Sequence, residues 1–257
     1  MIKLIDKDFK LFSEFKNYCK NDSFGTRIYS HFLCYGYEFD FAQFYVQISD
    51  NRVVCAVCNL ESDFVVCACD NTDFEELSAF LDFQKKRSVT FDICYEKYIN
   101  IESKTRCYGD ILTYKNSAVS ELDFELVTPE LKEYHSLLLT CESDDFSVPD
   151  YMHFLSDVSR RQMRELCNIK GIYADKTLAS CAMTVSYTDF SVILGAVATH
   201  PEHRKRGYAG CVVSSLAQEY CSSVPVYIYT TIEKNTRFYE KLGFVLSGRW
   251  TKFIMED

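Results

Sequence analysis

One stretch, Val192–Ala217, constrains the fold of this chain more than any other. It begins with the apolar run Val192–Ala198, which is typical of a buried strand, and continues through a polar connection that ends in glycine. From Ala209 onward, apolar residues recur at helical spacing and predict a helix with one inward face. A strand, a short glycine-bearing loop and a helix can build an anion site from backbone, because the first N–H groups of a helix have no partner within it.

The connection is also rich in positive charge. It contains Arg204, Lys205 and Arg206, whereas the whole chain has a formal net charge of -9. Overall composition does not explain a basic cluster on an acidic protein, so the cluster indicates a site for a negatively charged group. Gly207 leaves room for such a group to approach the backbone.

Composition sets broad limits on the class of protein. The 257 residues are 47% hydrophobic and 25% charged, which is ordinary for a globular protein of one large or two modest domains. No stretch approaches the roughly 20 apolar residues that span a bilayer, and Met1–Lys10 lacks the apolar core of a signal peptide. We therefore expect a cytoplasmic protein without a membrane partner. The acidic balance argues against a general nucleic-acid surface.

The sequence contains 13 cysteines. An odd number in a chain without an export signal argues against a disulfide framework. Cys55 and Cys58 form a C-x-x-C pair, followed closely by Cys67 and Cys69, so zinc binding is one interpretation. The other is that all four act as small apolar side chains in two adjacent strands. Their neighbours are mostly valine and alanine rather than the turn residues of a zinc knuckle, so we expect no metal.

Two segments predict the same order of elements. Tyr45–Lys86 and Gly171–Ala217 each predict strand, turn, strand, turn, strand and helix. They differ where the helix begins, because Asp70–Glu76 is acidic and lacks glycine, and carboxylates there repel a phosphate. Either the N-terminal half is a degenerate copy of the C-terminal half, or two strand meanders are alike by chance. The predicted domains are residues 1–120 and 121–257.

Three predictions concern the two ends of the chain. Met1–Asp22 has a rough apolar face and predicts a helix. Asn235–Leu242 predicts a short helix that Gly243 stops. After it, Phe244–Gly248 and Trp250–Met255 predict a final pair of strands.

Two motifs resemble those of a known family. The first is R-x-x-G-x-A at Arg204–Ala209, and the second is Y-x-x-x-G-F at Tyr239–Phe244. In this order they resemble the GNAT superfamily of acyl-CoA-dependent N-acyltransferases, over about half of the chain. The resemblance implies an α/β (α+β-like) fold for residues 121–257, with a mixed, largely antiparallel twisted sheet flanked by helices. The N-terminal part is then a degenerate copy or an appended α+β domain.

The resemblance also implies acetyl-CoA as co-substrate and assigns its site. The pantetheine arm would lie along Ala196–Thr199, where the N–H of Val197 polarises the acetyl carbonyl, and Gly195 fits a bulge that opens this strand. Tyr239 has the place of the acid that protonates the leaving thiolate; the alternative is a core aromatic. Asn235 either contacts the coenzyme or caps its helix. The residues expected to bind the coenzyme are Val197, Thr199, Arg204, Lys205, Arg206, Gly207, Tyr208, Ala209 and Asn235.

The implied acceptor is a primary amine of a small molecule or peptide. An alkyl amine arrives protonated, because its pKa is near 10.4, so it must lose a proton before attack. Many family members place a glutamate on the strand before the loop, but Phe190–Thr199 has no carboxylate. We therefore name no base. The candidates are Glu142, Asp144, Asp145, Glu233 and His200.

Two other functions compete with acetyl transfer. One is a non-catalytic acyl-CoA-binding module whose N-terminal half recognises a partner, although such a module has no need of Tyr239. The other is a tandem-GNAT ligase with an aminoacyl-tRNA donor. The net charge of -9 and the intact loop at Arg204–Ala209 argue against the ligase.

Overall fold

The computed structural model describes residues 1–115, 124–143, 146–231 and 233–255. The chain splits into two compact units. The first unit comprises Met1–Ile111 and Ser247–Asp257, and the second comprises Leu112–Leu246. Because β6 and β11 each have residues in both units, the chain passes between the units along these two strands.

The elements of the first part of the chain are β1 (Ile2–Leu4), α1 (Phe12–Cys19), α2 (Ser23–Tyr35), β2 (Ala42–Ser49), β3 (Arg52–Leu60), β4 (Asp63–Ala68), α3 (Phe74–Phe83), β5 (Ser88–Asp92), the short 3₁₀ helix η1 (Ile93–Tyr95) and β6 (Thr105–Tyr114). Those of the second part are α4 (Leu131–Leu139), α5 (Tyr151–Met163), β7 (Ile169–Ala174), β8 (Thr177–Tyr187), β9 (Val192–Thr199), η2 (Pro201–His203), α6 (Tyr208–Cys221), β10 (Val226–Thr230), α7 (Glu233–Lys241) and β11 (Phe244–Ile254).

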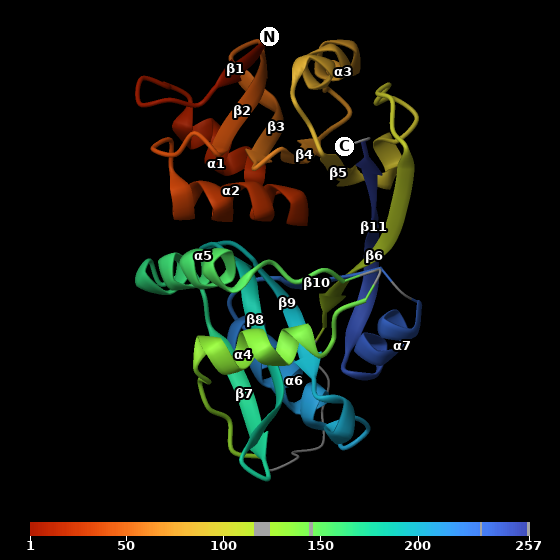
Figure 1. Cartoon of the computed structure of the whole chain (residues 1–257). Coiled ribbons are helices and arrows are strands. Elements are labelled where there is room, and N and C mark those ends of the chain that lie inside the picture. Colours follow the sequence, from red (N-terminus) through yellow and green to blue (C-terminus); the bar gives the residue numbers. More distant parts are fainter. Residues whose placement is uncertain (116–123, 144–145, 232, 256–257) are drawn as a thin grey trace. The chain divides into compact units, whose positions relative to one another are not determined.

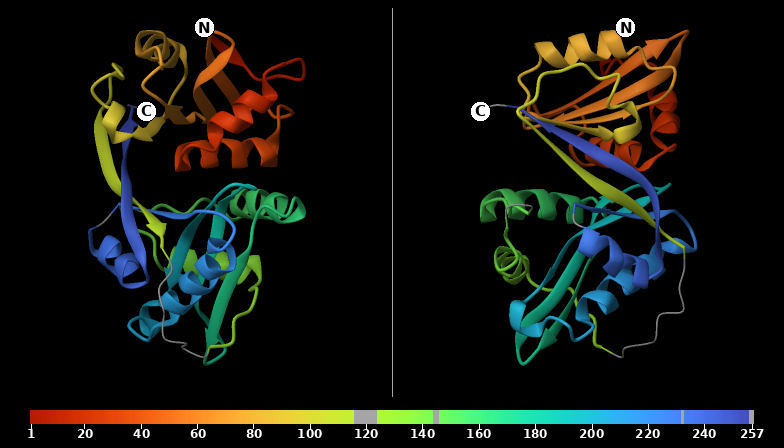
Figure 2. Two further views of the ribbon diagram at one scale, coloured as in Figure 1. Left: turned by 180° about the vertical axis from the view of Figure 1, so that it is seen from behind. Right: turned by 90° about the vertical axis from the view of Figure 1, so that its right-hand side faces the viewer.

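In the first unit the strands lie in the order β1-β2-β3-β4-β5-β11 (Figures 1 and 2). All neighbours are antiparallel except β4 and β5, which are parallel and joined by α3. Leu77 and Leu81 of α3 are buried in an apolar cluster with Phe64 and Phe91. The cluster also contains Phe253 from the last strand, so β11 completes the core of this unit.

In the second unit the order is β6-β10-β9-β8-β7. Strands β7, β8 and β9 are antiparallel, and β9 and β10 are parallel and joined by α6. Val212 and Leu216 of α6 are buried against β9 and β10. Helices α4 and α5 contribute Tyr134 and Phe154 to a second cluster that also contains Ala198 of β9. The predicted fold class, a mixed and largely antiparallel sheet flanked by helices, is confirmed.

The predicted repeat is present in the hairpins of the two units. The turns at Asp50–Asn51 and Asp175–Lys176 both have left-handed backbone, with φ values of 48° and 60° in the first and 52° and 65° in the second. Positive φ at both central residues is the geometry of a tight hairpin turn. The register also shifts near each turn, after Gln47 in β2 and after Ile172 in β7. The likeness therefore extends to individual residues and is more than a shared order of strands.

The parallel strand pairs repeat in the same way. Pairing of β4 with β5 covers Asp63–Val65, and pairing of β9 with β10 covers Val192–Leu194. Cys67 and Ala196 both lie two residues beyond the last parallel pair of their strands. The N-terminal unit thus repeats the strand and helix order of the C-terminal one.

Three predictions are corrected at the ends of the chain. The helix predicted over Met1–Asp22 is wrong at its start, because Ile2–Leu4 forms β1 and pairs with β2. The predicted final strand pair is one continuous strand, β11. The domain division also differs from the predicted 121–257, because Ser247–Asp257 groups with the first unit through the pairing of β11 with β5.

The cysteine run lies on two adjacent strands. Cys55 and Cys58 are on β3, Cys67 is on the neighbouring β4, and all three are buried, while Cys69 follows β4. Cys55 packs in the apolar cluster beneath α3. In the described residues, no group of three or more His, Cys, Asp or Glu side chains is placed to hold a metal ion. No helix in the described part of the chain combines the length and hydropathy needed to cross a membrane.

Candidate functional site

Strands β9 and β10 separate near their C-terminal ends. Their parallel pairing comprises Val192–Leu194 with Val226–Ile228. Strand β9 continues to Thr199 and β10 to Thr230 beyond the last pair. This separation gives the end of β9 an edge that faces away from β8, where an extended ligand can add hydrogen bonds as a further strand would.

A bulge lies in β9 just after the strands separate. Met183 pairs with Gly195 and Cys181 with Ala198, so β9 contains an extra residue over this span. The backbone of Ala196 is left-handed, with φ at 49°. The sequence predicts a bulge at Gly195, and the structure places its strained residue one position later.

Gly195 has a different physical role. A Cβ on this residue would lie 2.8 Å and 3.0 Å from the two Cγ atoms of Val185 on β8. The register of β8 also shifts beside this valine. Gly195 therefore allows a close approach of two strands, and the left-handed turn falls on its neighbour.

We expect Gly195→Ala to destabilise the second unit by about 1–3 kcal/mol, as overpacking of a core does. The change should also weaken acetyl-CoA binding, since β9 must shift to relieve the contact. Adding Val185→Ala removes the clashing methyl groups and should recover part of both losses, as thermal denaturation and calorimetry can measure. Wild-type stability and affinity in the single variant would contradict this account of the bulge.

The basic loop follows β9 through η2. Lys205 and Gly207 both have left-handed backbone, with φ of 63° and 87°. Gly207 is the N-cap residue of α6, and no side chain caps this helix there. The first N–H groups of α6 are therefore suited to donate hydrogen bonds to an anion from outside the chain. A Cβ on Gly207 would be strained whatever the space around it, because L residues rarely adopt this φ.

The charges of the loop are exposed. Arg204, Lys205, Arg206 and Gly207 all face solvent. Within the described part of the chain, none of the three cations forms an ion pair. The Nε atom of Arg204 donates to the carbonyl of Thr199 at 3.2 Å, which ties the loop back to the end of β9. The loop thus presents positive charge that its neighbours do not neutralise.

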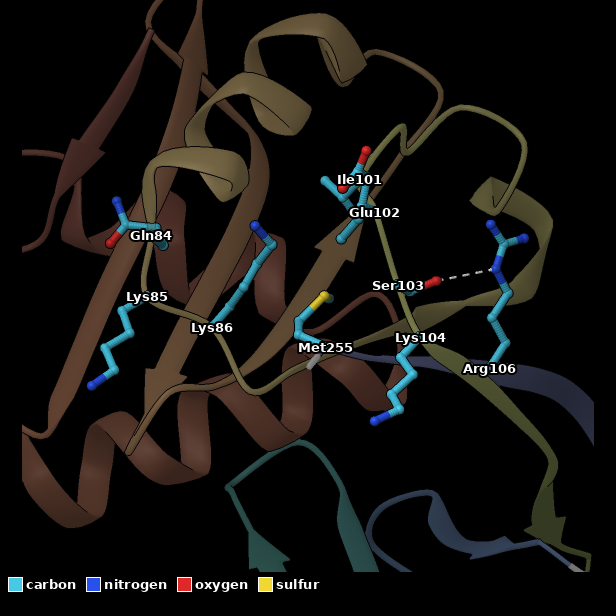
Figure 3. A pocket seen from close by; sticks show the side chains of 9 residues that line it. All are labelled: Gln84, Lys85, Lys86, Ile101, Glu102, Ser103, Lys104, Arg106 and Met255. Carbon is cyan, nitrogen blue, oxygen red and sulfur yellow. Dashed lines mark hydrogen bonds between the residues drawn. The ribbon is translucent and has the colours of Figure 1, made fainter. Parts of the chain in front are cut away.

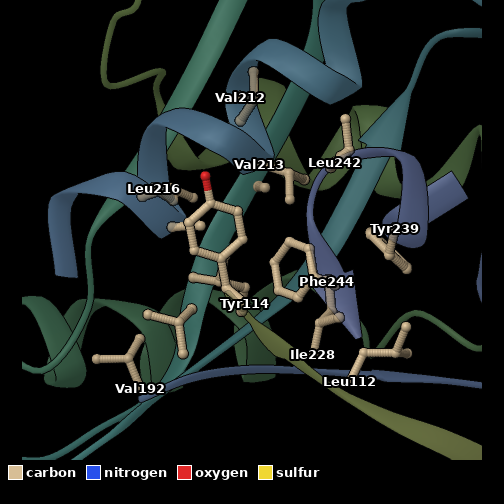
Figure 4. Close-up of a cluster of buried hydrophobic side chains, with 14 of the residues drawn as sticks. Leu112, Tyr114, Val192, Val212, Val213, Leu216, Ile228, Tyr239, Leu242 and Phe244 are labelled. Carbon is tan, nitrogen blue, oxygen red and sulfur yellow. The ribbon is translucent and has the colours of Figure 1, made fainter. Parts of the chain in front are cut away.

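Tyr239 lies on α7 in the apolar cluster beneath α6. Its side chain is 8% exposed and lies near Phe244 in this cluster, with ring centroids 5.9 Å apart (Figure 4). The ring of Phe238 is 5.1 Å away. Val197 and Tyr208 pack against the same cluster. Burial raises the pKa of Tyr239 to about 12, so this phenol keeps its proton at neutral pH. Tyr239, the predicted acid, thus shares one apolar cluster with a residue of β9 and a residue at the start of α6.

Asn235 is exposed on α7. The alternative of Asn235 as the N-cap is wrong, because the helix already begins at Glu233. Its predicted contact with the coenzyme remains a prediction.

The candidate bases are engaged in local hydrogen bonds or fall outside the described residues. Glu142 accepts a hydrogen bond from the backbone N–H of Val148 at 3.2 Å. The Nδ1 atom of His200 accepts from the N–H of Glu202 at 3.4 Å and caps η2. Asp144, Asp145 and the side chain of Glu233 lie outside the description. The geometry therefore singles out no base.

Sequence reasoning missed one residue of this site, Tyr134 of α4. Its side chain is fully buried, and its hydroxyl donates to the carbonyl of Ala196 at 2.6 Å. It contacts β9 from the face of the sheet opposite to α6. Nothing in its spacing marks it among the 18 tyrosines of the chain.

A separate hollow of about 840 Å³ lies in the first unit and shares no residue with the predicted site. Figure 3 shows Lys86 on one side of this basic hollow and Arg106 on the other. Lys86 pairs with Asp82 at 3.3 Å and Arg106 with Glu96 at 2.8 Å. The hollow is lined by Gln84, Lys85, Lys86, Ile101, Glu102, Ser103, Lys104, Arg106 and Met255, so cations outnumber its single carboxylate.

Comparisons with known proteins match the C-terminal part of the sequence and the fold of nearly the whole chain. Residues 170–253 match the family described as FR47-like protein. No curated protein matches the sequence.

Several solved structures are similar over nearly the whole chain, among them the following three. An acetyltransferase of the GNAT family from Colwellia psychrerythraea is 14% identical, with a TM-score of 0.58 and coverage of 100% of both chains. A tandem GNAT protein from the clavulanic acid biosynthesis pathway is 10% identical, with a TM-score of 0.64 over 98% of this chain and 97% of that one. A Drosophila protein is 10% identical, with a TM-score of 0.67 over 98% of both chains.

The family match runs from β7 to β11 and contains the separated strands, the basic loop and α7. The likeness to solved structures extends over both units, and at this level of identity it concerns the fold. The repeat within the chain agrees with the likeness to a tandem protein. The chain therefore has a GNAT-type fold, and residues 170–253 match the FR47-like family within it.

Proposed function

We propose that this protein transfers an acetyl group from acetyl-CoA to a primary amine of a small molecule or peptide. The observation that carries the proposal is the junction of β9 and α6. A strand with an unpaired edge leads into a left-handed loop whose Gly207 opens a helix without a side-chain cap. The edge of β9 could pair with the extended pantetheine arm, and the start of α6 could bind the phosphates.

The residues of the second unit suit the parts of the coenzyme. The N–H groups of Gly207–Ala209 would hold the pyrophosphate, with charge-assisted hydrogen bonds from Arg204 and Arg206. The pantetheine arm would pair with Ala196–Thr199. Tyr208 packs between Phe124 and His203 at the start of α6, which holds the first turn of the helix in place.

The proposed reaction is a direct attack without a covalent enzyme intermediate. The amine nitrogen forms a bond to the acetyl carbon, the negative charge on the carbonyl oxygen is stabilised by the N–H of Val197, and the carbon–sulfur bond then breaks. The leaving group is the coenzyme thiolate, whose thiol form has a pKa of about 8.5. Tyr239 donates a proton to its sulfur as the bond breaks, which makes departure easier. Because the amine arrives protonated, its nitrogen loses one proton before the attack and a second afterwards, to water or to a base that we do not assign. Solvent then returns a proton to Tyr239.

The test is the release of free thiol from acetyl-CoA in the presence of a panel of amines. We expect amine-dependent release, with one acetylated amine formed for each thiol. The acylated product, identified by mass spectrometry, would show which amines are accepted. Tight binding of acetyl-CoA without turnover of any amine would reject the enzyme.

That outcome would favour the second candidate, a non-catalytic acyl-CoA-binding module. Two observations favour this alternative. Tyr239 is packed as a core aromatic at 8% exposure, and the first unit offers the basic hollow to an anionic partner. In that case the first unit recognises the partner and the second holds the coenzyme as a ligand.

A further inference from the structure

The phenol of Tyr134 is placed to act on one particular peptide group of β9. Its side chain is completely buried, and its hydroxyl lies 2.6 Å from the carbonyl oxygen of Ala196. Burial raises the pKa of Tyr134 well above its ordinary value, so the hydroxyl stays protonated and donates this hydrogen bond. An edge-on ring contact with Phe154 of α5 helps to fix the orientation of the phenol.

The carbonyl of Ala196 and the N–H of Val197 belong to one peptide group. Because that group is planar and trans, its C=O and N–H point in opposite directions. A hydrogen bond that fixes the carbonyl on the α4 side therefore also fixes the N–H on the other side. The bond also polarises the peptide, which makes its N–H a stronger donor.

We propose that Tyr134 is a positioning residue that aims the N–H of Val197 at the thioester carbonyl of the bound coenzyme. This inference rests on the proposed function. Ala196 has φ of 49°, a conformation that an alanine does not favour unaided. The hydrogen bond from Tyr134 stabilises this conformation and with it the bulge. Tyr134 contacts no substrate atom in this scheme and acts through the peptide alone.

The first unit contains the same hydrogen bond without the bulge. Tyr18 of α1 donates to the carbonyl of Cys67 at 3.2 Å and to that of Val54 at 2.9 Å. Like Ala196 in β9, Cys67 lies two residues beyond the last parallel pair of its strand. Yet β4 pairs with β3 in unbroken register through this residue. The helix-to-strand bond is thus common to both units, and only in the second unit does it hold a left-handed residue.

This repeat supplies a matched control. Tyr134→Phe and Tyr18→Phe each remove one phenolic hydroxyl that donates from a helix to a strand carbonyl of its own unit. We expect both variants to lose thermal stability. Only Tyr134→Phe should lower kcat, by about 10- to 100-fold, which is below the 10²–10³-fold cost of deleting such a donor outright. The Kd for acetyl-CoA should change much less than kcat, because the N–H acts mainly on charge that develops during reaction.

A double variant separates activity from folding. Ala196→Gly accommodates the positive φ without strain, so Tyr134→Phe/Ala196→Gly should regain stability while kcat stays low. Recovery of kcat together with stability would overturn the positioning role. So would an unchanged kcat in Tyr134→Phe, or an equal loss of kcat in Tyr18→Phe.

The amide resonance of Val197 gives a readout that does not need turnover. Its proton should shift in Tyr134→Phe and stay in place in Tyr18→Phe. Wild-type protein that binds acetyl-CoA but never releases thiol would reject the proposed function. A wild-type enzyme that turns over, with Tyr134→Phe as active as it, would reject only the role of Tyr134.

Discussion

Gly207→Val is expected to abolish acetyl-CoA binding in calorimetry. Two effects combine at this position. The backbone has φ of 87°, which an L residue adopts at a cost of about 1–2 kcal/mol, so the start of α6 would rearrange. The branched side chain would also stand over the first N–H groups of the helix, where the phosphates would approach. Either effect removes the geometry on which the proposed coenzyme site depends.

Gly36→Val is the matched control. Gly36 ends α2 in the first unit, has φ of 60° and has no atom within 4 Å of the place its Cβ would take. Gly36 has ψ of -145° where Gly207 has -7°, so valine at Gly36 strains the backbone at least as strongly, far along the chain from the loop. We expect a fall in Tm at least as large and an unchanged Kd for acetyl-CoA. Wild-type affinity in Gly207→Val would remove the loop from the coenzyme site.

The centre of the candidate site could be predicted because several local signals agree there. The apolar run, the glycine and the helical spacing of Val192–Ala217 correspond to β9, the left-handed turn and α6 in that order. Each of these features depends on residues close in sequence. The hairpin turn at Asp175–Lys176 could be predicted for the same reason, because the residues of a short polar turn determine its conformation.

Pairing between segments distant in the chain was harder to predict from the sequence. The apolar residues of Met1–Asp22 fit a helix, yet Ile2–Leu4 pairs with β2 from the middle of the unit. The return of Ser247–Asp257 to the first unit depends on β5, which lies far earlier in the chain. Such pairing is decided by the sheet that is already present, and tertiary context overrides local pattern.

The bulge in β9 was predicted from Gly195, but the glycine has another role there. An isolated glycine in a strand indicates either a bulge or a close approach of backbone. At Gly195 the structure shows the close approach, to Val185, while the left-handed φ belongs to Ala196. Tyr134, which stabilises that conformation, comes from a helix distant in sequence and carries no motif.

Tyr239→Phe is expected to lower kcat by about 10²-fold or more, the usual contribution of a positioned acid, with little change in the Kd for acetyl-CoA. Phenylalanine keeps the ring contacts with Phe238 and Phe244 and removes only the proton donor. Because burial raises the pKa of Tyr239 to about 12, the phenol should remain a donor through the accessible range. Loss of activity from its ionisation should therefore be absent below about pH 11, one unit under that value.

Tyr114→Phe separates catalysis from packing in the same apolar cluster. Tyr114 is buried there beside Phe244, and its hydroxyl has no hydrogen-bond partner within the described structure. Removing this hydroxyl should leave kcat unchanged and hold or raise Tm, since an unsatisfied buried polar atom is costly. The comparison is direct because both variants lose one phenolic oxygen from one core. Equal kcat values for the two variants and wild type would identify Tyr239 as a core aromatic and favour the binding module.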